Sequence, residues 1–307
     1  MRILITGVCG FVGSELAVQL RAAGHDVSGI DSLIRPGTHL NVARLRALGV
    51  SIRHGDIRQA SDFETLAPCD WVIDAAANPS VLAGIDGRTS TRQLVEHNLL
   101  GTTNTLEFCR QRQAGLVLLS TSRVYSVQAL CAIPLASRDE AFVPTGGTWP
   151  TGASQGGLDE AFSTAAPISL YGATKLASEA LALEYRHAFN LPVVINRCGV
   201  LAGPGQFGTA EQGIFSYWVR SWAAGRPLRY IGFGGTGHQV RDALHPVDLA
   251  NLVVRQIVRG LDASGVWNVG GGPDNAMSLA QLSAWCRDRF GDRPVDRDPA
   301  PRRWDVP

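Results

Sequence analysis

The chain opens with Met1-Arg-Ile-Leu-Ile-Thr6-Gly7-Val-Cys-Gly10-Phe11-Val12-Gly13. Ile3 to Ile5 form a short apolar run, which is typical of a strand buried on both faces of a sheet. A glycine-rich turn follows, and residues 14–20 then show the pattern of a helix. This order predicts a dinucleotide site, because glycines let the backbone approach a diphosphate and a helix N-terminus offers free N–H groups. We expect the cofactor to contact Gly7, Gly10, Phe11, Val12 and Gly13.

The next predicted strand, residues 26–30, ends in Asp31. A carboxylate at this place binds both hydroxyls of an adenosine ribose and repels a 2′-phosphate, so it favours NAD over NADP. The alternative is an ordinary buried strand and turn with a solvated aspartate. Three glycines in register with the acid make that alternative the weaker one. Arg35, shortly afterwards, is a further candidate cofactor contact.

Composition restricts the classes of protein. The chain has 307 residues, of which 45% are hydrophobic and 18% charged, and its net charge is +1. This suits one large α/β unit or two coupled lobes, and it offers no basic surface for nucleic acid or an anionic membrane. Six scattered cysteines without a CxxC pair, and seven histidines without ligand spacing, favour neither disulfides nor a metal site.

The ends of the chain and its apolar runs bear on location. The first strand begins next to Met1, so we expect no signal peptide, and no uncharged apolar run has the length of a membrane span. These features predict a cytoplasmic protein that does not bind membranes. The chain stops at Trp304 to Pro307 without a closing helix, so we expect it to be truncated.

Strands and helices alternate through the first two thirds of the chain. Further strands are expected at residues 50–54, 71–76, 116–119 and 192–196, with long helices at 91–111 and 169–190. The pattern predicts a Rossmann-type, doubly wound parallel sheet. We assign residues 1–198 and about 238–269 to this domain, since residues 266–269 resemble a strand of the same sheet. Residues 199–237 and 270–307 are then a smaller substrate lobe.

Two further groups of residues point to chemistry. Ala75, Ala76 and Ala77 follow the fourth strand, where small residues let a flat cofactor lie against the backbone, although alanines there also simply pack well.

Tyr171 and Lys175 are four residues apart, so they lie on one face of a helix. A free tyrosine, with a pKa of roughly 10, is a poor base, but a nearby ammonium favours its phenolate. The phenolate then takes a proton from a substrate hydroxyl. A surface tyrosine with a solvated lysine is the alternative interpretation.

With these motifs the chain resembles the extended short-chain dehydrogenases/reductases that act on nucleotide sugars. TGxxGFxG matches at Thr6–Gly13 and YxxxK at Tyr171–Lys175. The resemblance implies cofactor contacts at Asp56, Ile57 and Asn98, and a catalytic hydroxyl at Thr121. It also implies phosphate-facing arginines at Arg241 and Arg302, and a homodimer built from the two long helices.

Within that family, local strings resemble the CDP-paratose 2-epimerases. They include Thr6-Gly-Val-Cys-Gly-Phe11, Gly157-Leu-Asp-Glu160 and Gly203-Pro-Gly-Gln206-Phe207. The departures are Ser126, Gly199, Val200 and Gly205, which stand where that subgroup carries other residues near the sugar. The 4,6-dehydratases of the family carry Thr-Asp-Glu, whereas this chain has Thr121-Ser122-Arg123, so dehydration is not expected.

The resemblance implies an epimerase that oxidises one sugar carbon transiently and reduces it again with the same NAD. Tyr171 is the expected base, Thr121 binds the reacting oxygen, and Lys175 anchors the ribose. The substrate is expected to be a CDP-hexose reacting at C2. A UDP-sugar reacting at C4, or a ketosugar reductase, is the alternative. Gln206 and Phe207 either hold the nucleotide base or pack the lobe, and Cys198 either touches the nicotinamide or is a core residue.

Overall fold

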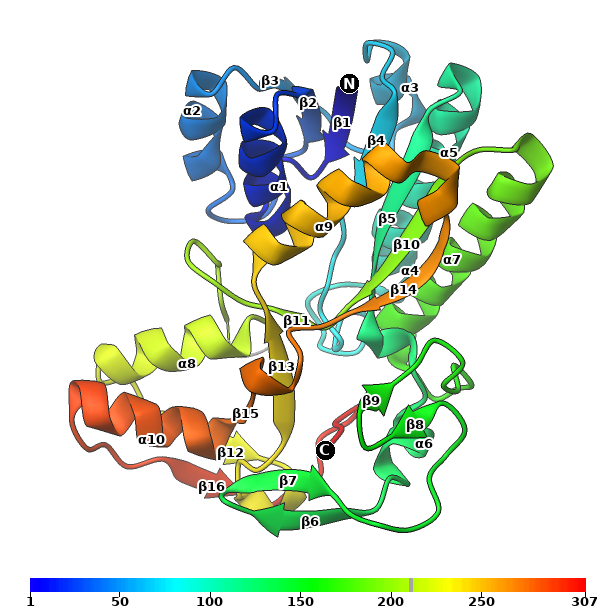
Figure 1. Cartoon of the computed structure of the whole chain (residues 1–307). Helices are drawn as coiled ribbons and strands as arrows, with labels where there is room; N and C mark the ends of the chain where they lie inside the picture. The colour runs from blue at the N-terminus through cyan, green and yellow to red at the C-terminus, as the bar shows by residue number, and fades with distance from the viewer. Residues whose placement is uncertain (210–211) are drawn as a thin grey trace. The chain divides into compact units, whose positions relative to one another are not determined.

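A seven-stranded parallel sheet forms the centre of the first of two compact units in this computed structural model, which describes residues 1–209 and 212–307 (Figure 1). The spatial order of its strands is β14-β10-β5-β4-β1-β2-β3. Their bounds are β1 (Arg2–Thr6), β2 (Asp26–Asp31), β3 (Ser51–His54), β4 (Trp71–Asp74), β5 (Gly115–Thr121), β10 (Val193–Cys198) and β14 (Gly265–Val269). The predicted doubly wound fold is confirmed, and β14 pairs with β10 as a strand of the main sheet.

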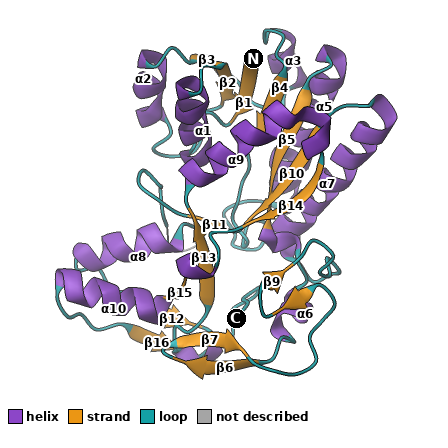
Figure 2. Cartoon of the chain, in the orientation of Figure 1, coloured by secondary structure: helices purple, strands orange, loops and turns teal. Residues whose placement is uncertain are grey.

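Helices cover both faces of this sheet (Figure 2). On one face α1 (Phe11–Ala22) packs against α9 (Pro246–Arg259), with α2 (His39–Ala47) beside α1. The other face carries α5 (Gly101–Arg112) and α7 (Ser169–Phe189), and α3 (Ala60–Glu64) lies against α5. The predicted helix at 91–111 is α4 (Thr91–Val95), a π-helical turn (Glu96–Leu100) and α5 in direct succession. A short 3₁₀ turn (Gly260–Ala263) follows α9.

The buried strands explain why the sheet forms where the sequence predicts it. Ile3, Leu4 and Ile5 are at most 1% exposed, and Val193 to Ile195 are fully buried. A central strand covered on both faces needs apolar side chains on both, so it shows a continuous rather than an alternating pattern. Each such side chain contributes about 1.5–3 kcal/mol on burial. The apolar runs thus hold the carboxyl ends of the strands at one edge.

The second unit comprises residues 123–169, 199–244 and 270–307. Small sheets join β11 (Val200–Leu201), β13 (Val240–Leu244) and β15 (Ala276–Ser278); β12 (Arg229–Ile231) and β16 (Asp296–Asp298); β6 (Leu135–Arg138) and β7 (Ala141–Pro144); and β8 (Ala153–Ser154) and β9 (Gly157–Leu158). Its helices are α6 (Val127–Cys131), α8 (Ile214–Ala223) and α10 (Leu279–Phe290). The 3₁₀ turns are Ser122–Val124, at the border of the units, Phe233–Gly235 and Pro273–Asn275.

An aromatic core holds α8, β12 and α10 together. The rings of Trp218 and Tyr230 stack with centroids 5.4 Å apart. The hydroxyl of Ser283 accepts from both, at 2.9 Å from the Trp218 indole nitrogen and 2.7 Å from the Tyr230 oxygen. Trp222 is fully buried beside them. The polar groups of Trp218 and Tyr230 are therefore both hydrogen-bonded within the protein, as buried polar groups require.

The boundaries of the units differ from the sequence-based assignment. Residues 123–169 and 238–244 were assigned to the nucleotide domain, and both segments pack within the second unit. The first unit is residues 1–122, 170–198 and 245–269. The segment 123–169 contains only short strands and one short helix, so its sequence carried no periodicity that separates it from the sheet.

Other global expectations concern cysteines, metals and membranes. All six cysteines are free thiols. Among residues 1–209 and 212–307, we find no group of three or more His, Cys, Asp or Glu side chains arranged to hold a metal ion. Across the same residues, every helix is too short or too polar to cross a membrane.

Candidate active site

The glycine turn after β1 has a shape that only glycine allows at two positions. Gly7 has a φ of +66°, and a Cβ there would lie 2.9 Å from the Cα of Ala76. A Cβ on Gly13 would lie 2.2 Å from the carbonyl oxygen of Gly7. The Gly7 N–H donates to the Ile30 carbonyl at 2.8 Å and so fastens the turn to β2. The turn therefore packs as tightly as the sequence motif predicts.

Helix α1 begins at this turn with its first N–H groups uncapped by a side chain. Its N-cap is Gly10, and the first turn carries no acidic residue. The first intrahelical bond runs from the Ser14 N–H to the Gly10 carbonyl, at 2.9 Å. The amides of Phe11, Val12 and Gly13 precede that bond, so α-helical geometry gives them no partner within the helix. Backbone N–H groups and the positive end of the helix dipole fit the diphosphate of a dinucleotide.

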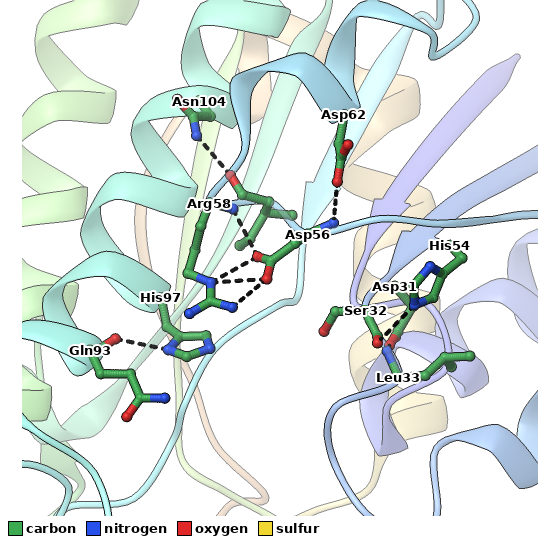
Figure 3. Close-up of polar contacts among 11 residues, drawn as sticks. Asp31, Ser32, Leu33, His54, Asp56, Arg58, Asp62, Gln93, His97 and Asn104 are labelled. Carbon is green, nitrogen blue, oxygen red and sulfur yellow. Dashed lines mark hydrogen bonds and ion pairs between the residues drawn. The ribbon is translucent and has the colours of Figure 1, made fainter.

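Asp31, the last residue of β2, binds the glycine turn and the loop after β2 by its carboxylate, and Figure 3 shows its contact with Leu33. One oxygen accepts from the Cys9 N–H and the other from the Leu33 N–H, each at 2.8 Å. The side chain is 9% exposed. Each carboxylate oxygen retains a further lone pair, so the group is fixed and still able to accept from ribose hydroxyls. Burial and, to a smaller extent, the same carboxylate raise the pKa of Cys9 to about 12.

Asp56 lies after β3, the strand next to β2, and is paired with Arg58 (Figure 3). Burial acts to raise the pKa of Asp56, but hydrogen bonds and charge from Arg58 outweigh it and hold that pKa below its ordinary value. The Asp56 N–H donates to Asp62 at 2.7 Å, and the Ile57 carbonyl accepts from Asn104 at 2.8 Å. This loop is thus preorganised, with its aspartate carboxylate engaged by a neighbouring cation.

The other nearby candidate, Arg35, lies between β2 and α2 and is half-buried. Burial lowers the pKa of its guanidinium. Its carbonyl accepts from the backbone N–H and the hydroxyl of Thr38, at 3.2 and 2.8 Å. These bonds form a local turn that fixes the backbone at Arg35.

The alanines after β4 are held by the threonine of the glycine motif. The amides of Ala75 and Ala76 both donate to the Thr6 hydroxyl oxygen, at 3.2 Å. Ala75, Ala76 and Ala77 are all half-buried. Ala76 also packs on Gly7, so a Cβ at position 7 would clash with its backbone. The glycine turn and the alanines after β4 are therefore in direct contact.

Asn98 connects this loop to α7 from within the π-helical turn. Its side-chain oxygen accepts from the Asn78 N–H at 2.8 Å, and its amide donates to the Asn78 carbonyl and to the Thr174 hydroxyl, both at 3.1 Å. Both amide hydrogens are thereby used inside the protein, and the side chain is 1% exposed. A π-helical turn often marks a functional position. Here the π-helical turn places Asn98 so that its side chain binds both the loop after β4, at Asn78, and α7, at Thr174.

Tyr171 and Lys175 lie on the first two turns of α7, as the spacing predicts. Tyr171 is 7% exposed and Lys175 is 2% exposed. Burial lowers the pKa of the Lys175 ammonium, against the opposing charges of Asp74, Glu179 and Cys198. A buried amine with a shifted pKa is a recurrent feature of catalytic sites.

Thr121 ends β5, and Cys198 ends the neighbouring strand β10 directly opposite it. Both are buried, and burial raises the pKa of the Cys198 thiol to about 12. At that pKa the thiol is protonated and unreactive near neutral pH. The structure thus places Thr121 and Cys198 together at the carboxyl edge of the sheet.

A buried ion pair lies one turn further along α7. Glu179 accepts from the guanidinium of Arg197 at 2.8 Å and also from the Ser120 hydroxyl. Glu179 is 2% and Arg197 is 8% exposed. Ser120 and Arg197 are opposite each other in register and each precedes a site residue, Thr121 or Cys198. The cluster therefore fixes both strand ends to the helix that carries Tyr171 and Lys175.

In the second unit, Arg241 lies on β13 against the segment 304–307. Its guanidinium donates to the carbonyls of Val306 and Pro307 at 2.9 and 2.8 Å, and it lies 3.6 Å from Asp305. Arg123 donates to the Trp304 carbonyl at 3.2 Å. Carbonyl and carboxylate oxygens of residues 304–307 thus contact both Arg123 and Arg241.

Two further arginines lie close enough to Arg241 to act on its charge. Burial, the nearby Arg123 and, more weakly, Arg302 lower the pKa of Arg241 to about 10, against the carboxylates of Asp305 and Asp242. Converging guanidinium groups are a planar, multidentate site for phosphate. The two arginines predicted from sequence, Arg241 and Arg302, therefore affect each other, and Arg123 joins them.

A pocket of about 480 Å³ in the second unit is lined by residues 202–207 and by Phe215, Ser216, Val219 and Arg220 of α8. Both predicted base contacts, Gln206 and Phe207, are in this lining. The Gln206 amide donates to the Leu201 carbonyl and accepts from the Ser216 hydroxyl, both at 2.7 Å. A largely apolar lining with a few fixed polar groups suits a small planar ligand.

Comparison with known proteins decides the family. The model of the NAD dependent epimerase/dehydratase family matches residues 3–270. The chain belongs to that family. It is therefore an NAD-dependent enzyme, and the resemblance predicted from its motifs is confirmed.

Members of the epimerase/dehydratase family with known names are similar over most of the chain. CDP-paratose 2-epimerase of Salmonella typhi is 30% identical over 96% of this chain and 88% of its own length. The probable UDP-glucuronate 4-epimerase of Rhizobium meliloti is 29% identical, over 83% of this chain and 67% of its own length. The UDP-glucose 4-epimerase of Thermus thermophilus, solved with NAD, has a TM-score of 0.75 at 27% identity and covers 100% of this chain and 88% of that one.

Sequence reasoning missed two buried carboxylates beside the predicted catalytic residues of this family member, Asp74 and Glu179. Glu179 follows Lys175 by four residues, so helical spacing alone could have found it. Asp74 is the last residue of a strand, and its partners are distant in sequence. A further signal was also available. Lys175 is the only lysine in a chain with 27 arginines.

Proposed function

We propose that this chain is a nucleotide-sugar epimerase that inverts C2 of a CDP-hexose with the aid of bound NAD. The observation that carries the proposal is the arrangement in the first unit, where Tyr171 and Lys175 share α7 and Thr121 ends β5. The glycine turn and Asp31 belong to the same unit. Similarity to CDP-paratose 2-epimerase supports the choice of nucleotide and carbon.

NAD fits the residues that line the glycine turn. Gly7 and Gly13 leave no room for a Cβ, the first amides of α1 would hold the diphosphate, and Asp31 suits a ribose without a 2′-phosphate. Bound NAD+ would supply the hydride chemistry for a transient oxidation and re-reduction of one sugar carbon. The cycle restores the cofactor, so the protein has no need to exchange it.

The side chains supply the proton transfer. Tyr171, as phenolate, takes the proton of the reacting hydroxyl and later returns it. Lys175 favours the phenolate by its charge and donates to the ribose. Thr121 donates a hydrogen bond to the reacting oxygen. Burial of Tyr171 and Lys175 strengthens these electrostatic interactions, because little water competes with them.

Elimination of water is a poor fit for this chain. Dehydratases of the family place an acid and a base directly after the threonine, and here Ser122 and Arg123 follow Thr121. A hydroxyl and a permanent cation provide neither group. Transient oxidation without elimination is the chemistry that the remaining residues support.

The second unit offers groups for the rest of the substrate. Arg241 and Arg302 would bind the diphosphate, with their charges already close enough to interact. The pocket at Gln206 and Phe207 would hold the pyrimidine base. Gly199, Val200 and Gly205 differ from the subgroup pattern, so the hexose itself need not be paratose.

The test combines cofactor release with isotopic labelling. Denatured protein should release NAD(H), and a panel of CDP- and UDP-sugars should identify the substrate. With that substrate deuterated at C2, the product keeps deuterium at C2 in ordinary water. Loss of deuterium to solvent would contradict the mechanism, retention with inversion at C4 would make the chain a C4 epimerase, and net consumption of NADH would make it a reductase.

A further inference from the structure

Lys175 has to carry a positive charge in a place that disfavours charge. It is the chain's only lysine, is 2% exposed, and burial lowers the pKa of its ammonium. Removing an ammonium from water is unfavourable unless an opposite charge compensates it. The question is which group compensates it.

Glu179 is the nearest carboxylate in sequence, and its charge is already matched. It follows Lys175 by one helical turn, but its oxygens accept from the guanidinium of Arg197 at 2.8 to 3.2 Å. Ser120 donates a further hydrogen bond. Because Arg197 carries a full positive charge next to Glu179, the pair presents little net charge to Lys175.

Asp74, at the end of β4, is different, because neutral hydroxyls bind it. Its two oxygens accept from Thr6 and Thr102, each at 2.7 Å, and the side chain is completely buried. The Thr6 oxygen accepts two backbone N–H groups, so its own hydrogen is directed to Asp74. Two donated hydrogen bonds fit the ionised, acceptor-only form of the carboxylate.

Two buried hydrogen bonds join β4 and α7 to the same stretch of helix, residues 98–102. Thr102, which binds Asp74, lies one helical turn after Asn98. Asn98 in turn donates to Thr174, the neighbour of Lys175, at 3.1 Å. The charge of Asp74 is also the largest of those that oppose the effect of burial on the pKa of Lys175.

We propose that Asp74 is the counter-charge of Lys175, a positioning residue that keeps the buried ammonium protonated. Thr6 of the glycine turn and Thr102 of α5 hold the carboxylate in place for this purpose. Only the final consequence, that the ammonium then acts on Tyr171, rests on the proposed function.

The charged groups around Lys175 determine in which direction its pKa should move when the charge of Asp74 is removed. Asp74 on β4, Glu179 on α7 and the Cys198 thiol on β10 all oppose the lowering of the Lys175 pKa. Arg197 offsets Glu179, and the Cys198 thiol is protonated near neutral pH because its pKa is about 12. Removing the charge of Asp74 should therefore lower the Lys175 pKa further, and the ammonium should be lost at a lower pH.

The single lysine allows a direct measurement. Protein with bound NAD, labelled with ¹³C-lysine, gives one Cε signal, and its chemical shift follows the charge of Lys175 through a pH titration. Asp74→Asn keeps the size of the side chain and an acceptor for Thr6, and the Thr102 hydroxyl can turn to accept. We expect the midpoint to fall by about one pH unit or more, as for loss of a close opposite charge.

Thr102→Val is the matched control, because it removes one hydrogen bond from Asp74 but leaves the charge. Its midpoint should stay close to that of the wild type. An unchanged midpoint in Asp74→Asn, or an equal shift in both variants, would overturn the proposal. If Asp74→Asn does not fold, Asp74→Ser, which also removes the charge, replaces it in the titration.

The two proposals can fail separately. If the chain is not an epimerase, the titration of Lys175 is unaffected, and if Asp74 is not the counter-charge, the epimerisation assay is unaffected.

Discussion

Tyr171 carries the proposed proton transfer, and a matched residue on the same helix allows it to be tested. Tyr171→Phe should lower turnover by about 10² to 10⁴, because the phenol is lost while the ring is kept. NAD content after denaturation should match the wild type. Tyr185, whose hydroxyl donates to Glu107, is the control, since Tyr185→Phe removes a phenol elsewhere on α7. Equal loss of activity in both variants would show that the helix, rather than the base, had been disturbed.

At the scale of single residues, the sequence predicts best what is local. The glycines and the YxxxK pair were found because turn geometry and helix spacing relate residues a few positions apart. Asp74 was missed because its two hydroxyl donors, Thr6 and Thr102, are far from it in sequence. Spacing also could not show that Arg58 occupies the Asp56 carboxylate, since that pairing depends on the bend after β3.

At the scale of elements, strands and helices of the sheet were predicted because burial on both faces leaves continuous apolar runs. The π-helical turn at Glu96–Leu100 was not, because one extra residue in a helix leaves the apolar pattern almost unchanged. The segment 123–169 belongs to the second compact unit, whereas the sequence-based assignment gave it to the nucleotide domain. Its short β6, β7, β8 and β9 lack the length that reveals periodicity.

The Glu179–Arg197 pair should tie α7 to the ends of β5 and β10. Glu179→Ala leaves a buried guanidinium without its partner, so we expect a loss of about 3–5 kcal/mol in the free energy of unfolding. Replacing both residues by methionine should cost less, because no charge then remains buried. Urea denaturation at a fixed, saturating NAD concentration measures both. If the double variant were as unstable as Glu179→Ala, the loss of stability would not come from the unpaired charge of Arg197, and this prediction would be wrong.

At the scale of the whole molecule, apolar side chains on α7 and on the helix at 91–112 bear on self-association. On the helix at 91–112, Leu94 and Leu106 are fully buried in the core of the unit and cannot contribute to an interface. Others remain exposed on the same helices: Val95 at 44%, Leu100 at 42%, Leu183 at 36% and Phe189 at 41%. Large apolar side chains gathered on adjacent helices are typical of protein interfaces.

We therefore predict a homodimer through these two helices, in which each pair packs on its copy. Leu100→Glu combined with Leu183→Glu places charges in that interface, and the protein should sediment as a monomer at micromolar concentration. Val258→Glu is the matched control, because Val258 is 64% exposed on α9, on the other face of the sheet, and its variant should stay dimeric. Isotopic retention should persist in the monomer, since the catalytic residues of this proposal all come from one chain. A wild-type protein that sediments as a monomer, or a control that dissociates equally, would contradict this interface.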